Sequence, residues 1–219
     1  MGHLTLERPW LTFDLGQEMT VLSWAVNRPG LVRAQQILWR EVRNRDLPPE
    51  LDAATWYEAE LHQRGAAQAV GFLTSRDVRQ FTEARAEVEG ITAHVVATVG
   101  LSNAERIGHR LDHSGRDWGT INIALQLSEG ITDAALIEAM SLVVQARTAA
   151  VIDAGLMLRS GLATGTGTDC VAVAAPTGTQ PYAGLHTAIG EAIGKATYEA
   201  VATACADWMA GSGRQPQQG

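Results

Sequence analysis

Nine residues, 161–169, gather groups that could bind a small molecule or take part in a reaction, and their sequence is GLATGTGTD. Glycines permit backbone conformations and close approaches that side chains forbid, and the hydroxyls of Thr164, Thr166 and Thr168 can donate or accept hydrogen bonds. Asp169 then supplies a carboxylate directly before an apolar run. We expect such a loop to form a site. The alternative is a glycine-rich turn that Asp169 closes by accepting hydrogen bonds from its own backbone.

Pairs of polar residues also occur at three other predicted strand ends, and strand ends commonly line pockets in sheet proteins. These pairs are Thr74-Ser75, Ser102-Asn103, and Thr120 with Asn122. His186 stands at the start of the last predicted helix, where the helix dipole disfavours the charged form of an imidazole. Together with the loop 161–169, these residues predict one site.

Strands and helices must carry these side chains, and hydrophobic periodicity predicts where they lie. The clearest strand is 119–127, in which four aliphatic residues alternate with Thr120, Asn122, Ala124 and Gln126. A period of two places the aliphatic set on one face and the polar set on the other. Further strands are predicted at 20–27, at 68–73, at 84–100 with a break at Glu89-Gly90, and at 170–175.

Helices are predicted from caps and from apolar stripes. The first helix is 52–64, with Asp52 as its cap and Gly65 as its stop, and a short piece at 77–81 is capped by Thr74 or Ser75. A long helix runs from Thr132 to about Asp153, and its inward residues are Ile137, Met140, Val144 and Val151. The last helix is about 186–208, and its inward residues are Ile189, Ile193, Val201 and Trp208. In the last helix, Gly190 and Gly194 would let another backbone approach closely.

Strands grouped in the middle of the chain, followed by long helices, predict an α+β fold. We expect a single domain over residues 1–210, with a largely antiparallel or mixed sheet covered by helices. The tail 211–219 (GSGRQPQQG) has the low complexity of a disordered segment.

Composition excludes several classes of protein. The formal net charge of −7 argues against nucleic-acid binding, because that affinity rests on lysine and arginine side chains that displace counterions. The two cysteines, Cys170 and Cys205, lie in apolar patterns, which suggests core residues in a reducing compartment. The N-terminus lacks a signal-peptide pattern, and the apolar stretches fall short of the roughly 20 residues of a membrane span. We expect a cytoplasmic protein without nucleic-acid or membrane partners.

Three further histidines are not expected to be catalytic. His94 shares a face of its predicted strand with Val96 and Thr98, which favours a paired histidine within the sheet. His109 and His113 lie four residues apart in the long polar segment 101–119, where Gly115 and its polar neighbours favour a solvated loop.

Five segments, in their order along the chain, resemble the adenosylcobinamide amidohydrolase family of corrinoid salvage and remodelling. They are VGFLTSRDV (70–78), ATVGLSNAERIG (97–108), GTINI (119–123), LATGTGTDCVAVA (162–174) and HTAIGEAIGKATYEAV (186–201). The resemblance runs from about Thr20 to Val201. One departure is the sequence Asn-Arg-Pro-Gly at 27–30, where members of the family are expected to carry a glycine pair.

The resemblance implies an enzyme that hydrolyses one linear amide, cleaving adenosylcobinamide to adenosylcobyric acid and aminopropanol. Some members of the family also act on complete corrinoids with a foreign lower base. The implied partner is a small-molecule corrinoid, and no cofactor or metal is implied beyond the cobalt of the substrate. The alternative is a corrinoid-binding module without catalysis. A homodimer is expected only because two-fold dimers are the commonest assembly.

Amide hydrolysis needs an activated nucleophile, a stabilised oxyanion and a protonated leaving amine. The sequence has no GxSxG or HExxH motif. Three routes remain open. Asp169 could orient His186 as the general base on water; a threonine of the loop, with Thr166 at its centre, could be the nucleophile with His186 as base; or Asp169 alone could activate water. In the third route Asn103, Asn122 and loop N–H groups would hold the oxyanion.

A corrin ring is broad, apolar on its faces and fringed with amides, so its pocket should combine aromatic surface with amide partners. Trp24 and Trp118 are the tryptophans nearest to the matching segments. We therefore expect substrate contacts from Thr74, Ser75, Asn103, Trp118, Thr120, Asn122, Thr164, Gly165 and Thr168.

Overall fold

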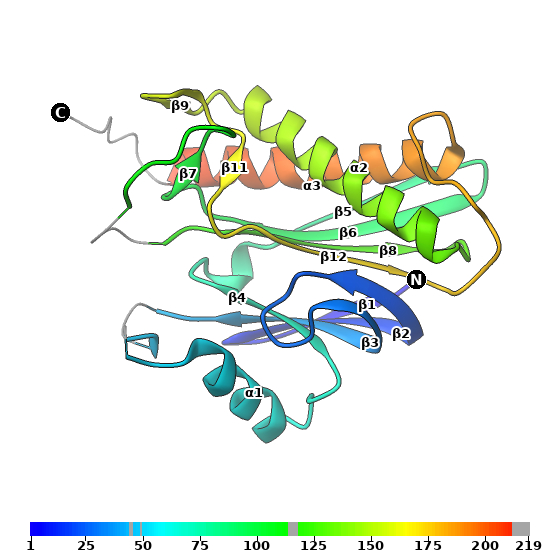
Figure 1. Ribbon diagram of the computed structural model, residues 1–219, viewed down its shortest axis with the longest axis horizontal. Coiled ribbons are helices and arrows are strands. Elements are labelled where there is room, and N and C mark those ends of the chain that lie inside the picture. The colour runs from blue at the N-terminus through cyan, green and yellow to red at the C-terminus, as the bar shows by residue number, and fades with distance from the viewer. Residues whose placement is uncertain (44–45, 49, 114–117, 212–219) are drawn as a thin grey trace.

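A mixed sheet forms the centre of the molecule in the computed structural model, which describes residues 1–43, 46–48, 50–113 and 118–211 (Figure 1). Within these residues eight strands form this sheet in the order β4-β3-β2-β12-β8-β6-β5, with β1 paired to β2. They are β1 (His3–Glu7), β2 (Trp10–Ser23), β3 (Gly30–Glu41), β4 (Val70–Thr74), β5 (Thr82–Val88), β6 (Ile91–Val99), β8 (Ile121–Leu127) and β12 (Cys170–Ala175). The pairs β3–β4 and β8–β12 are parallel and the others antiparallel. The predicted α+β class with a mixed sheet is confirmed.

The sheet folds back on itself at β2. Its pairing with β3 shifts register between Asp14 and Met19, and Gly16 there has a φ of +80°, the left-handed region that suits glycine. The half made of β1 to β4 consequently lies over the half made of β5, β6, β8 and β12 (Figure 1). Side chains of both halves, such as Phe13 and Ala124, share one buried cluster between them.

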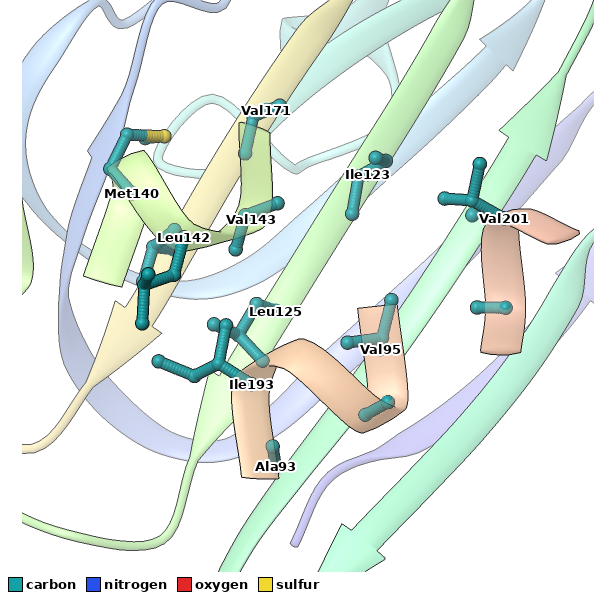
Figure 2. Packing of buried hydrophobic residues seen from close by; sticks show 14 of the residues in the cluster. Ala93, Val95, Ile123, Leu125, Met140, Leu142, Val143, Val171, Ile193 and Val201 are labelled. Carbon is teal, nitrogen blue, oxygen red and sulfur yellow. The ribbon is translucent and has the colours of Figure 1, made fainter. Parts of the chain in front are cut away.

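Helices cover both outer faces of this folded sheet, which gives four layers (Figure 1). The helix α1 (Ala53–Gln63) packs on the first half with Tyr57 and Leu61. The helices α2 (Asp133–Asp153) and α3 (Ala188–Gly211) cover the second half. Figure 2 shows Val143 and Ile193 of these two helices against Leu125 of β8. Because sheet halves and helices enclose β8, all seven of its residues are buried.

Several predicted boundaries are confirmed. Asp52 caps α1 by accepting from the N–H of Ala54, and Thr132 caps α2 by accepting from the N–H of Ala135. The segment 84–100 is the hairpin β5–β6, which turns at Glu89-Gly90, and 119–127 and 170–175 contain β8 and β12.

The predicted strand 20–27 is wrong at both ends, because β2 begins at Trp10 and ends at Ser23. The strands β1 and β3 were not predicted. The cap of the short helix Val78–Gln80 is Asp77, which accepts from the N–H of Arg79, and not Thr74 or Ser75. The Thr74 hydroxyl instead accepts from the N–H of Arg76 at 3.1 Å, which shapes the preceding turn.

The predicted inward stripe of α2 is wrong at Ile137, which is 64% exposed. Leu136, Ala139 and Val143 face the core instead, because α2 packs against both β12 and α3 and so buries a broad face. This helix is long enough, and with a mean hydropathy of 1.5 apolar enough, to cross a membrane by composition alone, with 44% of that window buried in the protein. The expectation that no apolar stretch reaches about 20 residues concerned uninterrupted runs, and Glu138 and Arg147 interrupt this helix.

Of the two glycines of α3, only Gly190 makes the expected close approach. A Cβ at Gly190 would collide with the backbone oxygen of Gly184, whereas a Cβ at Gly194 would meet nothing within 4 Å. The helix continues to Gly211, and the remainder of the predicted tail, 212–219, lies outside the described residues.

Candidate active site

A pocket of about 880 Å³ lies where β4 meets the beginnings of β8 and β12. It is lined by short segments that are far apart in the sequence. The lining residues of the predicted site are Thr74, Ser75, Trp118, Thr120, Asn122, Thr168 and Asp169, and the other lining residues are Trp24, Val26, Val42, Arg43, Leu47, Gly71, Phe72, Leu73, Gly119 and Cys170. The pocket therefore gathers seven of the twelve residues that the sequence predicted.

Hydrogen bonds tie the floor of this pocket to β4. The side-chain N–H of Asn122 donates to the backbone oxygen of Leu73 at 2.8 Å, and the Thr120 hydroxyl donates to the Thr168 backbone oxygen at 2.8 Å. The Ser75 hydroxyl donates to the backbone oxygen of Trp118. These bonds explain why asparagine, a poor strand former, occupies the start of a buried strand.

Asp169 joins the loop 161–169 to β8 and α2. Its Oδ1 accepts from the Thr166 hydroxyl at 2.5 Å and from the backbone N–H of Ile121 at 3.2 Å. Its Oδ2 accepts from the guanidinium of Arg147, and the two side chains are only 8% and 12% exposed. Burial raises the pKa of the Asp169 carboxyl, and Arg147 and Thr166 oppose that rise.

Gly165 packs directly against this ion pair. A Cβ at Gly165 would lie 2.6 Å from Oδ2 of Asp169 and 3.0 Å from Nη1 of Arg147. The loop therefore needs glycine there for close approach to a charged pair, not for contact with the pocket.

Asn103 and Thr164 hold the loop 161–169 in place by hydrogen bonds outside the pocket. Asn103 accepts from the N–H of Gly119 at 3.0 Å and donates to the hydroxyl of Thr168 at 3.2 Å. The Thr164 hydroxyl accepts from the N–H of Ile107 at 2.8 Å. Two short strands, β7 (Ala104–Glu105) and β11 (Gly165–Thr166), pair with each other in antiparallel orientation. Four residues predicted to bind substrate or to react, Asn103, Thr164, Gly165 and Thr166, thus lie beside the pocket without lining it.

The predicted pairing of His186 with Asp169 is not formed. Asp169 precedes β12, and His186 follows it, exposed and two residues before the first residue of α3. A strand rises about 3.3 Å per residue, so roughly 20 Å of β12 separates the two positions. Figure 1 shows β11 and the start of α3 at opposite ends of β12. The two routes that use His186 as base have no support in this arrangement.

Sequence reasoning missed Arg147 and the pocket-lining residues Cys170 and Arg43. No sequence pattern marks Arg147, because α2 brings it to Asp169 only in the fold. Burial raises the pKa of the Cys170 thiol to about 12, so this thiol is protonated at neutral pH and a poor nucleophile. Arg43 forms an ion pair with Glu41, and its Nη2 lies 2.5 Å from Oε1 of that carboxylate.

The structure also shows the surroundings of His94, His109 and His113. His94 is fully buried, with Nε2 at 2.7 Å from Oε1 of Glu83, as expected for a paired histidine in the sheet. The expectation of a solvated loop is wrong for His113, whose side chain is 10% exposed and lies 3.2 Å from Glu105, and His109 is exposed. Among the described residues, no group of three or more His, Cys, Asp or Glu side chains could hold a metal ion.

Comparison with known proteins bears directly on this site. No curated protein matches the chain. The family model for adenosylcobinamide amidohydrolase matches residues 2–213 of the 219, and this range contains every residue that lines the pocket. The chain therefore belongs to the adenosylcobinamide amidohydrolase family, whose members hydrolyse an amide of that corrinoid in cobalamin salvage.

Proposed function

We propose that the pocket beside Asp169 is where this chain hydrolyses the aminopropanol amide of adenosylcobinamide. The observation that carries this proposal is the position of Asp169, which is the acidic side chain among the described residues that line the pocket. Its raised pKa makes it a stronger base than an ordinary aspartate, and general bases work best when their pKa approaches the working pH.

In the proposed reaction, Asp169 takes a proton from water as the water oxygen attacks the amide carbon. The carboxylate has about four acceptor sites, and its present partners occupy them, so the Thr166 hydroxyl must turn away to admit the water. The second amide N–H of Asn122 donates to the oxyanion, whereas the single O–H of Thr120 stays bonded to the backbone oxygen of Thr168. Asp169 then returns its proton to the nitrogen as the carbon–nitrogen bond breaks, which gives adenosylcobyric acid and aminopropanol.

Three substitutions separate this route from the others. We expect Asp169→Asn to lower kcat by about 100-fold or more, because the general base is lost. We expect Thr166→Val and His186→Gln to keep kcat within about 3-fold, because neither group reacts in this route. The measurement is release of aminopropanol at saturating substrate, with the melting temperature of each variant as a folding control. Loss of turnover in Thr166→Val alone would instead identify Thr166 as the nucleophile.

The pH dependence of kcat gives a second test. Because burial raises the pKa of Asp169, we expect the acid limb of the kcat profile to lie above the ordinary aspartate value of about 3.9. The rate should fall as the pH drops through that raised pKa, since the protonated carboxyl cannot accept a proton. A flat profile down to pH 4 would count against Asp169 as the base.

We also propose that the enzyme is cytoplasmic, works without a resident metal or cofactor, and has no nucleic-acid or membrane partner. Both cysteines are free thiols, which supports a reducing compartment, and the net charge of −7 opposes nucleic-acid binding. A homodimer and activity on complete corrinoids with a foreign lower base remain parts of the proposal. Sedimentation of the purified protein and assay of a complete corrinoid test them.

A further inference from the structure

An exposed apolar wall borders the pocket. Trp24 and Val26 follow β2 and line the pocket, yet they are 45% and 46% exposed. The indole N–H of Trp24 donates to the backbone oxygen of Asp169 at 2.7 Å. This bond satisfies the only polar atom of the side chain and fixes the orientation of its ring. The rest of the indole is apolar surface in water, beside the residue to which we assign the chemistry.

The polarity of the pocket changes with depth. Its floor carries three buried polar side chains, Thr74, Thr120 and Asn122, which are 1%, 7% and 1% exposed. They lie next to the buried apolar lining residues Val42 and Phe72. Its rim is open and carries exposed apolar side chains, with Trp118 54% exposed in addition to Trp24 and Val26. The rim also includes the exposed polar residues Arg43 and Thr168. A ligand that fits this gradient has a broad apolar body and a narrow polar arm.

A corrinoid with an aminopropanol arm has that shape. A pocket of roughly 300–1,000 Å³ encloses a drug-sized ligand, and the volume of about 880 Å³ falls in this range. A corrinoid is considerably larger, so only part of it can enter. Its macrocycle has wide apolar faces, whereas the scissile amide lies on a chain at its edge. The corrin–cobalt unit of adenosylcobinamide also carries a net positive charge, which the face of an indole attracts.

We propose that the corrin macrocycle docks against the wall formed by Trp24 and Val26 while its aminopropanol arm reaches the floor at Thr120 and Asn122. The inference rests on the proposed function only for the place of the reaction. Trp24 then contributes affinity for the ring, and Asp169 contributes chemistry on the arm. Because the indole N–H of Trp24 is hydrogen-bonded to the backbone oxygen of Asp169, the docked macrocycle and the Asp169 carboxylate keep a fixed relative position.

The test uses adenosylcobyric acid, the product, because it has the corrin ring but no arm and cannot be turned over. Calorimetric titration should show that Trp24→Ala weakens its binding about 10- to 100-fold, as for aromatic anchors at other interfaces. Trp24→Phe keeps an aromatic face and should lose less. Trp56→Ala is the matched control, because Trp56 belongs to α1, packs beside Tyr57 and Arg40 and does not line the pocket; this variant should leave binding unchanged.

Kinetics with adenosylcobinamide complete the test. Trp24→Ala should raise KM by a larger factor than it lowers kcat, because the variant loses the wall and the bond to the Asp169 backbone but keeps the partners of the Asp169 side chain. Unchanged affinity of Trp24→Ala for adenosylcobyric acid, or no measurable binding by the unaltered protein, would overturn the docking mode. If Asp169→Asn kept full turnover while Trp24→Ala still lost affinity, the assignment of the chemistry would fail and the docking mode would stand.

Discussion

At the scale of single residues, the Asp169 carboxylate ties together the loop, β8 and α2. Its partners are Thr166, the backbone of Ile121 and the guanidinium of Arg147. Residue types and spacing predicted Asp169 as a chemical group and the loop as a site. They could not predict Arg147, because the helix that carries it meets the loop only after both have packed on the sheet. The position of His186 could not be predicted for the same reason, since nearness along the chain does not reveal which end of a strand a residue occupies.

Gly165 provides the prediction at this scale. We expect Gly165→Ala to lower the free energy of unfolding by about 3 kcal/mol, because its Cβ would force apart the buried pair Asp169–Arg147 and breaking such a pair is costly. Urea denaturation measures the change. Gly167→Ala is the control, because its Cβ would lie 4.0 Å from the nearest atom, Oε1 of Glu105. Equal stability of the two variants would show that the pair tolerates displacement.

At the scale of elements, the two strands that begin at the pocket were the ones best predicted from sequence. The alternation in 119–127 and the apolar run 170–175 gave β8 and β12, which pair in parallel so that Asn122 lies opposite Cys170. The first strands were predicted poorly, because β1 is mostly exposed and β2 bends at a register shift. The inward face of α2 was predicted wrongly because apolar residues of this helix lie on most of its circumference, so that hydrophobic periodicity indicates no single stripe.

The helix α3 offers a matched pair of substitutions. We expect Gly190→Ala to destabilise the protein, because its Cβ would collide with the backbone of Gly184, which cannot move independently of the turn before the helix. Gly194→Ala should stabilise it by up to about 1 kcal/mol, since alanine has the higher helix propensity and the space is open. Thermal denaturation compares the two. A stabilising Gly190→Ala would mean that the preceding turn repacks.

At the scale of the whole molecule, the sheet folds over and buries β8 on both faces. The alternation in β8 predicted its two faces correctly, but sequence alone could not show that the polar face meets the other half of the sheet instead of water. That face carries Asn122 to the pocket and Gln126 to the opposite end, where Gln126 bonds the backbone of Gly2 and Leu15.

The folding of one half of the sheet over the other also buries His94, which makes the free energy of unfolding depend on pH. Burial lowers the pKa of His94, nearby Arg85 lowers it further, and Glu83 opposes them; the ring also packs against Phe13 of the other half-sheet. Because the folded-state pKa lies below the unfolded value of about 6.5, the unfolded chain binds the proton more readily. Stability should be fully present above pH 6.5 and fall as the pH drops towards the folded-state pKa. In urea titrations at several pH values, His94→Gln should reduce the dependence of the free energy of unfolding on pH. An unaltered slope in His94→Gln would assign the effect to other groups.

The most direct measurement is quantification of both products by mass spectrometry after incubation with adenosylcobinamide, for the unaltered protein and for Asp169→Asn. Our account predicts equimolar adenosylcobyric acid and aminopropanol from the unaltered protein, and a rate at least about 100-fold lower from the variant, which should still bind adenosylcobyric acid. Equal rates from both proteins would remove Asp169 from the chemistry and would contradict the account.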